Sequence, residues 1–251
     1  MQQPYRDSLE HLQEELARLD LLLQRGVIIA RATPGPAVPD DLRGVVVCDE
    51  EVTALAKAPD IVGERWRRQS AASIALAPLD ERLREVQRAI EVRRALSENA
   101  GTKLALPHLA RQFGLSPAEV DLLLIALAAE VEPRYETLYA YLQVDATRKR
   151  PGVDLALNLI CRSAAEKIYA RQLLLPDAPL VRHMLVHLLD DPQDREPTVL
   201  RRFLKADESV VRFLLQHPRK PRALAAVKAA MSGQKIALAD MYVSLYRSLA
   251  A

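Results

Sequence analysis

The feature that most constrains the fold is a pair of apolar segments joined by four residues, Gly-Leu-Ser-Pro, at positions 114–117. Residues 104–113 and 118–131 both carry apolar side chains at helical spacing. Gly114 suits the left-handed conformation that ends a helix, Ser116 suits the cap of the next helix, and Pro117 suits its first position. The stretch therefore predicts two helices joined by a tight turn, a helix-turn-helix.

The charges on the second of these helices argue against its insertion into a DNA groove. Residues 112–133 contain no lysine or arginine, whereas several acidic side chains lie among them. A helix that approaches phosphates needs positive charge. We therefore expect this helix to lie in the core, where its apolar side chains are buried: Val120, Leu123, Leu124 and Leu127.

The bulk composition is that of an ordinary globular chain. Its 251 residues are 49% hydrophobic and 27% charged, and the formal net charge is +2, so the chain as a whole is not a polycation. Aromatic residues, at 4%, are too scarce for a base-stacking surface. Cys48 and Cys161 form no disulfide framework, and neither a membrane span nor a signal peptide is evident, so we expect a cytoplasmic location.

The clearest single helix covers residues 7–24. Asp7, followed by Glu10 three residues later, has the spacing of a capping box. A stripe of leucines then follows at alternating steps of three and four: Leu9, Leu12, Leu16, Leu19 and Leu23. Two heptads are marginal for an independent coiled coil. The stripe therefore packs either on its own domain or on a second subunit, which leaves a homo-oligomer open.

A β-branched run at residues 45–48 predicts one short extra strand near the N-terminus. Asp49 follows this strand as the metal-binding aspartate does in P-loop ATPases. That chemistry also needs a glycine-rich loop ending in Gly-Lys-Ser/Thr, and the sequence contains none. Asp49 is therefore expected to cap a helix. Trp66 lies among three arginines, which is typical of a solvated helix face, a protein-interface anchor or a nucleic-acid contact.

The later part of the chain has the element order of a winged-helix domain. Helices are expected in five places: residues 79–96, 134–144, 153–161, 164–174 and 207–216. Before the last of them, residues 180–189 and 198–204 are expected to form two strands around a polar turn. The predicted fold class is therefore mainly α, a helical winged-helix architecture with a β-hairpin wing.

This pattern predicts that the chain is divided into three parts. Residues 1–60 are expected to form an N-terminal helix with a short strand–helix unit, and residues 61–217 the helical winged-helix domain. Residues 218–251 are expected to form a helical tail, which is either a packed hairpin or a loosely attached end.

The sequence offers no constellation for catalysis or for a cofactor. His183 and His187 are four residues apart, but the zinc-protease signature needs glutamate directly after the first histidine, and methionine stands there. Spacing indicates no third metal ligand. The remaining histidines are isolated and are expected at the surface or at helix ends: His11, His108 and His217. We therefore expect no cofactor, no metal and no enzymatic activity.

Four stretches resemble one family. They are residues 5–23 (YRDSLEHLQEELARLDLLL), 43–55 (RGVVVCDEEVTAL), 113–157 and 200–215 (LRRFLKADESVVRFLL). All are similar to the N-terminal winged-helix region of bacterial AAA+ ATPases associated with contractile injection systems. In that family an ATPase module follows, but its Walker A, Walker B and arginine-finger residues have no counterpart in this sequence. The resemblance implies a role in engaging a partner or substrate beside a hexameric motor.

Two hypotheses for function follow. The first is a non-catalytic protein-interaction domain that works through the leucine stripe, the Trp66 segment and the hairpin with Arg201 and Arg202. The second is a winged-helix DNA-binding regulator. Its basic residues would lie on the inserted helix, on the wing and in a short run before Pro151: Lys167, Arg171, Arg201, Arg202, Arg148, Lys149 and Arg150.

Overall fold

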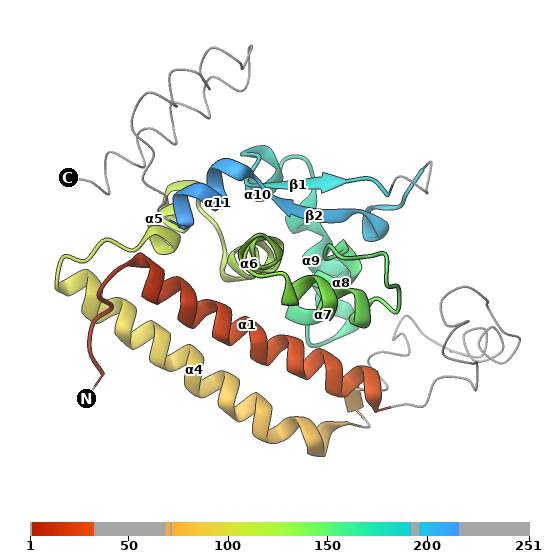
Figure 1. Cartoon of the computed structure of the whole chain (residues 1–251), viewed down its shortest axis with the longest axis horizontal. Helices are drawn as coiled ribbons and strands as arrows, with labels where there is room; N and C mark the ends of the chain where they lie inside the picture. Colours follow the sequence, from red (N-terminus) through yellow and green to blue (C-terminus); the bar gives the residue numbers. More distant parts are fainter. Residues whose placement is uncertain (1, 33–68, 71, 192–195, 216–251) are drawn as a thin grey trace, which may run out of the picture.

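The computed structural model describes residues 2–32, 69–70, 72–191 and 196–215. The strand predicted at residues 45–48, Asp49, Trp66, His217 and the tail at residues 218–251 lie outside the described residues. The predicted divisions at residues 60 and 217 therefore stay predictions. The rest is mostly helical with one small antiparallel sheet, so the predicted fold class is confirmed (Figure 1).

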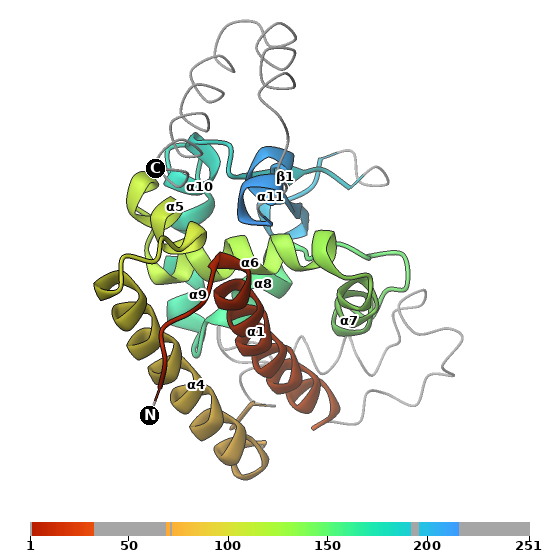
Figure 2. The ribbon, with the colours of Figure 1, turned by 60° about the vertical axis from the view of Figure 1, so that its left-hand side comes forward.

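Helix α6 (Pro117–Val131) lies at the centre of the fold, and every residue from Leu122 to Ala128 is buried (Figure 1). Helices α1 (Ser8–Arg31), α7 (Arg134–Leu142) and α8 (Val153–Ile160) pack around it, and the sheet covers another side (Figure 2). The Tyr139 hydroxyl of α7 donates a buried hydrogen bond of 2.7 Å to the carbonyl of Ile125. The predicted core role of α6 is confirmed, with Val120 partly buried at its edge.

The turn before α6 has the left-handed glycine and the serine cap that its sequence predicts. Gly114 ends α5 (Ala105–Phe113) with φ +65°. Ser116 caps α6: its hydroxyl accepts from the Glu119 backbone N–H, and the Glu119 carboxylate accepts from the Ser116 backbone N–H at 2.8 Å. This capping box satisfies two backbone donors at the start of the helix. The helix-turn-helix is therefore confirmed.

Substituting Gly114 tests this turn. A Cβ at Gly114 would meet nothing within 4 Å, so the expected loss comes from the left-handed backbone alone. Gly114→Ala should lower the free energy of unfolding by about 1–2 kcal/mol. Gly114→Asn should lose clearly less, because asparagine tolerates this conformation. Urea denaturation measures both, and equal losses for the two variants would contradict the backbone explanation.

Helices α1 and α4 (Ser73–Asn99) run antiparallel along one side of the molecule (Figure 1). Ion pairs join their opposite ends: Arg25 Nε lies 3.1 Å from Asp80 Oδ1, and the Arg93 guanidinium lies 2.6 Å from Glu10 Oε1. Both helices are longer than predicted. The added turns pack on each other through Ile29 and Leu76, a long-range contact that holds α4 helical on the N-terminal side of Pro78.

The leucine stripe of α1 packs on its own domain. Asp7 caps the helix as predicted, accepting from the Glu10 backbone N–H at 2.8 Å. Four of the leucines are at most 8% exposed and belong to the main core: Leu12, Leu16, Leu19 and Leu23. Their burial removes them from the predicted partner surface, and Leu9, at 43%, is the one member that stays exposed.

The wing is confirmed as a hairpin, but its strands are shorter and later than predicted. Strand β1 (Val186–Leu189) pairs with β2 (Phe203–Ala206), with Val186 opposite Ala206. The first half of the predicted strand 180–189 is instead helix α10 (Pro179–Arg182), which begins at a proline in the first helical position. The predicted strand 198–204 begins as a 3-10 turn, η3 (Val199–Arg201). Helix α11 (Glu208–Leu214) follows, capped by Asp207 as predicted.

A third extended segment joins the hairpin from far away in the sequence. Gly152 pairs with Phe203, and the Val153 backbone N–H donates to the Arg202 carbonyl at 2.9 Å. On the other side of this bridge, the Leu204 N–H donates to the Pro151 carbonyl at 2.8 Å. These bonds fix the start of α8 against the wing.

His11 is buried, which corrects its predicted place at the surface or at a helix end. It lies beneath α4 at 1% exposure, with its ring 5.0 Å from that of Tyr5 in an edge-on arrangement. Neither ring nitrogen has a hydrogen-bond partner, although Nε2 lies 3.6 Å from the Glu15 carboxylate. Burial, reinforced by the nearby positive charge of Arg94, lowers the pKa of His11 to about 4. The folded protein therefore holds this imidazole neutral.

The folded protein should lose stability between pH 7.5 and pH 5. The unfolded chain takes up a proton on His11 near pH 6.5, whereas the folded chain resists protonation until about pH 4. The loss from this one group should reach about 2 kcal/mol at pH 5. Urea denaturation at the two pH values measures it. His11→Leu should show a smaller loss, and an unchanged loss in that variant would contradict the role of His11.

Candidate interaction surface

Helix α9 (Ala164–Ala170) and the 3-10 turn η2 (Arg171–Leu174) form the most exposed part of the winged-helix region. Ser163 caps α9 by accepting from the Glu166 backbone N–H at 3.1 Å. No residue of α9 is buried. The predicted helix at residues 164–174 is therefore present in two pieces.

Helix α9 carries Lys167, a residue expected on the inserted helix, and η2 and α10 lie between α9 and the wing along the chain. The bridge at Gly152, then α8, α9, β1 and β2 follow in that order along the chain. The α8–α9 pair is thus a second helix-turn-helix beside the wing. It is distinct from the α5–α6 pair, whose second helix is buried.

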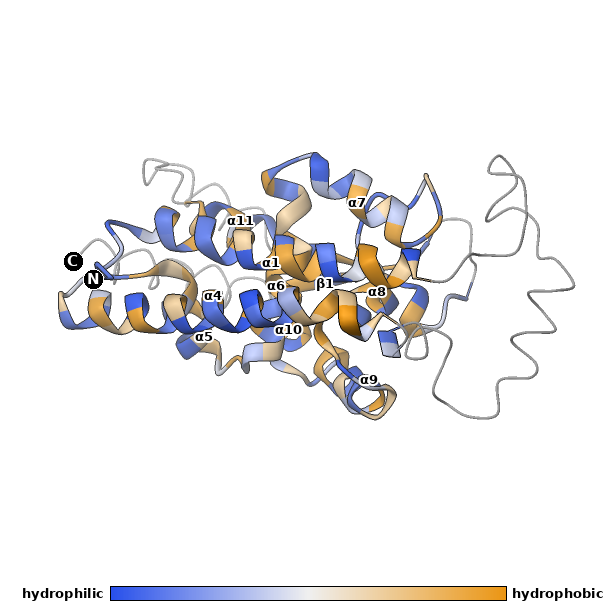
Figure 3. Ribbon diagram, turned by 90° about the horizontal axis from the view of Figure 1, so that it is seen from below, coloured by the Kyte–Doolittle hydropathy of each residue, from blue (hydrophilic) through white to orange (hydrophobic). Residues whose placement is uncertain are grey.

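The exposed side chains of α9 include two large apolar ones, and a third follows just after η2. Tyr169 is 71% exposed and Ile168 48%, and Leu175, just after η2, is 48% exposed. In the ribbon coloured by hydropathy, α8 is mostly orange, whereas α4 alternates between blue and orange bands (Figure 3). Sequence patterning missed this group, because exposed and buried apolar residues look alike until the partner elements of a helix are known.

Most of the predicted DNA contacts are paired with carboxylates. Lys167 Nζ lies 2.5 Å from Asp154 Oδ1, and Arg202 Nε lies 2.8 Å from Asp190 Oδ1. Such pairs must be broken, or shared, before these cations can neutralise a phosphate. Arg171 and Arg150 are exposed, and Arg201 is the last residue of η3, in the segment that joins the two strands of the wing.

The basic run at residues 148–150 forms a structural corner between α7 and the wing. The Arg148 guanidinium lies 3.1 Å from Asp191 Oδ2 and stacks 5.1 Å above the Phe203 ring. Lys149 lies 3.9 Å from the Glu136 carboxylate. The Gln143 side-chain amide holds the corner, donating to the carbonyls of Arg148 and Arg150 at 2.9 Å. Arg148 and Arg202 thus both lie at the loop end of the hairpin, where β1 ends and β2 begins, whereas Lys167 pairs with Asp154 of α8.

The two histidines considered for metal binding have separate surroundings. His187 Nε2 lies 2.8 Å from Asp207 Oδ2, whereas the His183 ring packs 5.1 Å from that of Phe113. Among the described residues, no group of three or more His, Cys, Asp or Glu side chains is arranged to hold a metal ion. No helix in this part of the chain is long and apolar enough to cross a membrane.

The family model described as "Winged helix domain, variant" matches residues 1–227. The chain belongs to this family. No curated protein and no solved structure matches the chain. The matched range spans α1 and α4 as well as the wing.

Proposed function

We propose that this variant winged-helix domain is a non-catalytic protein-interaction module that docks its partner on α9 and η2. The observation that carries the proposal is the chemistry of the inserted helix. It exposes Ile168 and Tyr169 to solvent, while its lysine, Lys167, is paired with Asp154. Exposed aromatic and aliphatic side chains favour a protein surface as partner, whereas phosphates favour unpaired cations.

The partner in this proposal is an AAA+ motor module or another component of a contractile injection system, in the cytoplasm. This part rests on the four stretches of sequence that resemble the N-terminal region of such ATPases. The alternative, a DNA-binding regulator, draws on the exposed cations Arg150 and Arg171 near the wing and α9.

Charge introduced on α9 tests the proposal. Tyr169→Asp and Ile168→Asp should each weaken binding to the AAA+ motor module by at least tenfold, because each buries a carboxylate in the interface. Val92→Asp is the matched control, since Val92 is 49% exposed on α4. Isothermal titration calorimetry measures the affinities. Binding that all three variants leave unchanged would remove α9 as the docking site.

A DNA titration distinguishes the protein-interaction module from the DNA-binding regulator. Fluorescence anisotropy with duplex DNA over a salt series should show weak binding with a shallow salt slope. Tight binding whose affinity falls steeply with salt, as expected when several phosphates are neutralised, would favour the regulator instead if Arg171→Gln abolished that binding. Calorimetry with Mg-ATP should show no binding of nucleotide.

A further inference from the structure

The loop that ends α7 holds a valine in a backbone conformation that valine rarely adopts. Val144 has φ +54°, in the left-handed region. Its N–H donates to the Tyr141 carbonyl at 3.1 Å, and the N–H of Asp145 donates to the Ala140 carbonyl at 3.1 Å. This pair of bonds is the Schellman arrangement, in which glycine or asparagine usually takes the left-handed position. A β-branched side chain in that position crowds its own backbone, so Val144 lowers the stability of the fold.

Packing in the core does not offset this loss of stability. Val144 is 59% exposed, so its side chain gains little from burial. The apolar contact that often accompanies a Schellman motif needs an apolar residue at the next position, and Asp145 stands there. Strained residues of this kind cluster at binding sites and active sites. The exposed valine therefore points to a role outside the fold.

The loop around Val144 is held in place by side chains on both sides. The Gln143 side-chain oxygen accepts from the Gly152 N–H at 3.0 Å, and the Asp145 carboxylate accepts from the Thr147 N–H at 2.9 Å. Because these bonds order the loop before any partner arrives, binding on Val144 loses little conformational freedom.

Two further side chains extend the exposed surface around Val144. Tyr141, three residues earlier, is 47% exposed. The guanidinium of Arg31, the last residue of α1, lies 5.8 Å from the centre of the Tyr141 ring, and its Nε donates to the Tyr141 hydroxyl at 3.2 Å. Tyrosine and arginine are enriched among the side chains that dominate protein interfaces. We call Arg31, Tyr141 and Val144 the α7 surface.

The α7 surface carries a positive charge without a matching carboxylate. Arg31 forms no ion pair with any residue that the structure describes. The carboxylates of α7 and its loop are engaged elsewhere: Glu136 lies 3.9 Å from Lys149 Nζ, and Asp145 lies 3.7 Å from Arg148 Nε. A carboxylate next to an apolar side chain would therefore complement the α7 surface in both charge and polarity.

Helices α7 and α9 lie on opposite sides of the molecule (Figure 3). A partner element that docks on α9 therefore leaves the α7 surface open to a second element. Two contacts on opposite sides would hold the domain more firmly than either contact alone, because the second forms within an existing complex.

We propose that the α7 surface is a second docking site for the protein partner, and that it takes an apolar side chain with a neighbouring carboxylate. Val144 and Tyr141 contact the apolar side chain, and Arg31 pairs with the carboxylate. This inference rests on the proposed function and adds to it a second contact and the chemistry of that contact.

Val144→Gly separates a binding role from a structural one. Glycine relieves the left-handed strain but adds freedom to the unfolded chain, so the folding equilibrium constant should rise by roughly threefold. The affinity for the AAA+ motor module should fall by about fivefold or more, because an apolar contact is lost. Urea denaturation measures stability, and isothermal titration calorimetry measures affinity. A side chain with a purely structural role would leave the affinity unchanged.

Met184→Gly is the matched control for the backbone. Met184, just after α10, is the other non-glycine residue with a positive φ in the described part of the chain, at +51°. Its replacement should leave the affinity within about twofold. The charge has its own pair of variants: Arg31→Glu should weaken motor binding by about tenfold or more, because it opposes a carboxylate with a like charge. Arg82→Glu, on the exposed face of α4, should leave the affinity within about twofold.

Unchanged affinity in both Val144→Gly and Arg31→Glu would overturn the second docking site. If Tyr169→Asp weakens binding in the same titrations, the proposed function stands and only the α7 surface falls. If the α7 variants weaken binding but Tyr169→Asp does not, the docking site on α9 falls instead. No binding of the motor module by the unchanged chain would overturn both.

Sedimentation velocity of the chain alone tests the other occupant, a second copy of this chain. The unchanged chain should show no self-association that depends on Arg31. Self-association abolished by Arg31→Glu would assign the α7 surface to a second copy and overturn the proposal.

Discussion

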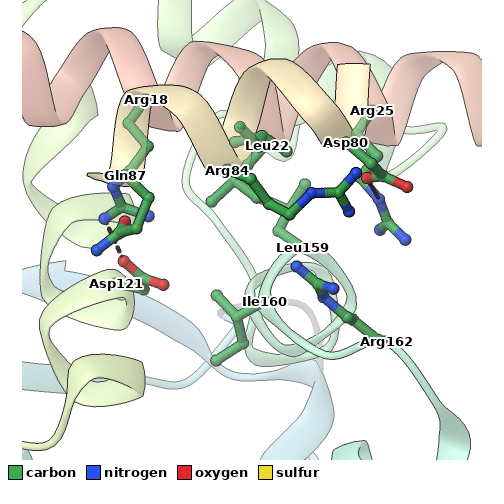
Figure 4. A pocket seen from close by; sticks show the side chains of 11 residues that line it. Arg18, Leu22, Arg25, Asp80, Arg84, Gln87, Asp121, Leu159, Ile160 and Arg162 are labelled. Carbon is green, nitrogen blue, oxygen red and sulfur yellow. Dashed lines mark hydrogen bonds and ion pairs between the residues drawn. The ribbon is translucent and has the colours of Figure 1, made fainter. Parts of the chain in front are cut away.

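Replacing Arg18 by alanine is expected to lower the free energy of unfolding by about 3–5 kcal/mol. The Arg18 side chain is 9% exposed and pairs with two carboxylates. Its Nε donates to Glu15 Oε2 at 2.8 Å, and its terminal nitrogen binds Asp121 on α6 (Figure 4). Burial raises the pKa of Asp121, and the Arg18 charge opposes that rise. Removing the guanidinium leaves two carboxylates in a poorly hydrated site, which is the costly way to break a buried ion pair.

Arg82→Ala is the matched control for this experiment. Arg82 pairs with Glu85 on α4 with the same spacing of three residues, but the two side chains are 65% and 52% exposed. Exposed pairs contribute little, so the control should change stability by less than about 1 kcal/mol. Denaturation in urea at pH 7 measures both variants. A loss below about 1 kcal/mol for Arg18→Ala would mean that water reaches Glu15 and Asp121 in the folded protein.

Leu19→Ala is expected to cost about 2–5 kcal/mol, whereas Leu9→Ala should cost less than about 1 kcal/mol. Both leucines belong to the same stripe on α1, but Leu19 is 1% exposed in the core and Leu9 is 43% exposed. The buried substitution removes transfer free energy and leaves a cavity between α1 and its neighbours, while the exposed substitution does neither.

The same pair of variants decides between the two interpretations of the stripe. If it packed on a second subunit, Leu9→Ala and Leu19→Ala would weaken self-association and leave the isolated chain equally stable. Sedimentation velocity measures self-association, and urea denaturation measures stability. A large stability loss for Leu19→Ala at every protein concentration is the expected result.

Local chemistry explains why some elements were predictable to the residue. The boundary between α5 and α6 depends on Gly114, Ser116 and Pro117, whose backbone preferences act within one turn. Asp7 and Asp207 likewise cap helices that start where the sequence indicates. Where the boundary depends on a distant contact, the prediction was wrong. Helix α4 begins before Pro78 because Leu76 packs on α1, a contact that no local pattern reveals.

The sequence by itself determined that this chain is mainly helical, that α6 is a core helix, and that a hairpin follows the α8–α9 pair. Those features follow from periodicity, capping residues and the absence of cations near α6, all of which act over short separations. Only the tertiary structure decided which faces are covered. It buried four leucines of α1, left Tyr169 of α9 exposed, and paired Arg18 of α1 with Asp121 of α6. Burial and charge compensation depend on which elements meet in space, and that information is spread over the whole chain.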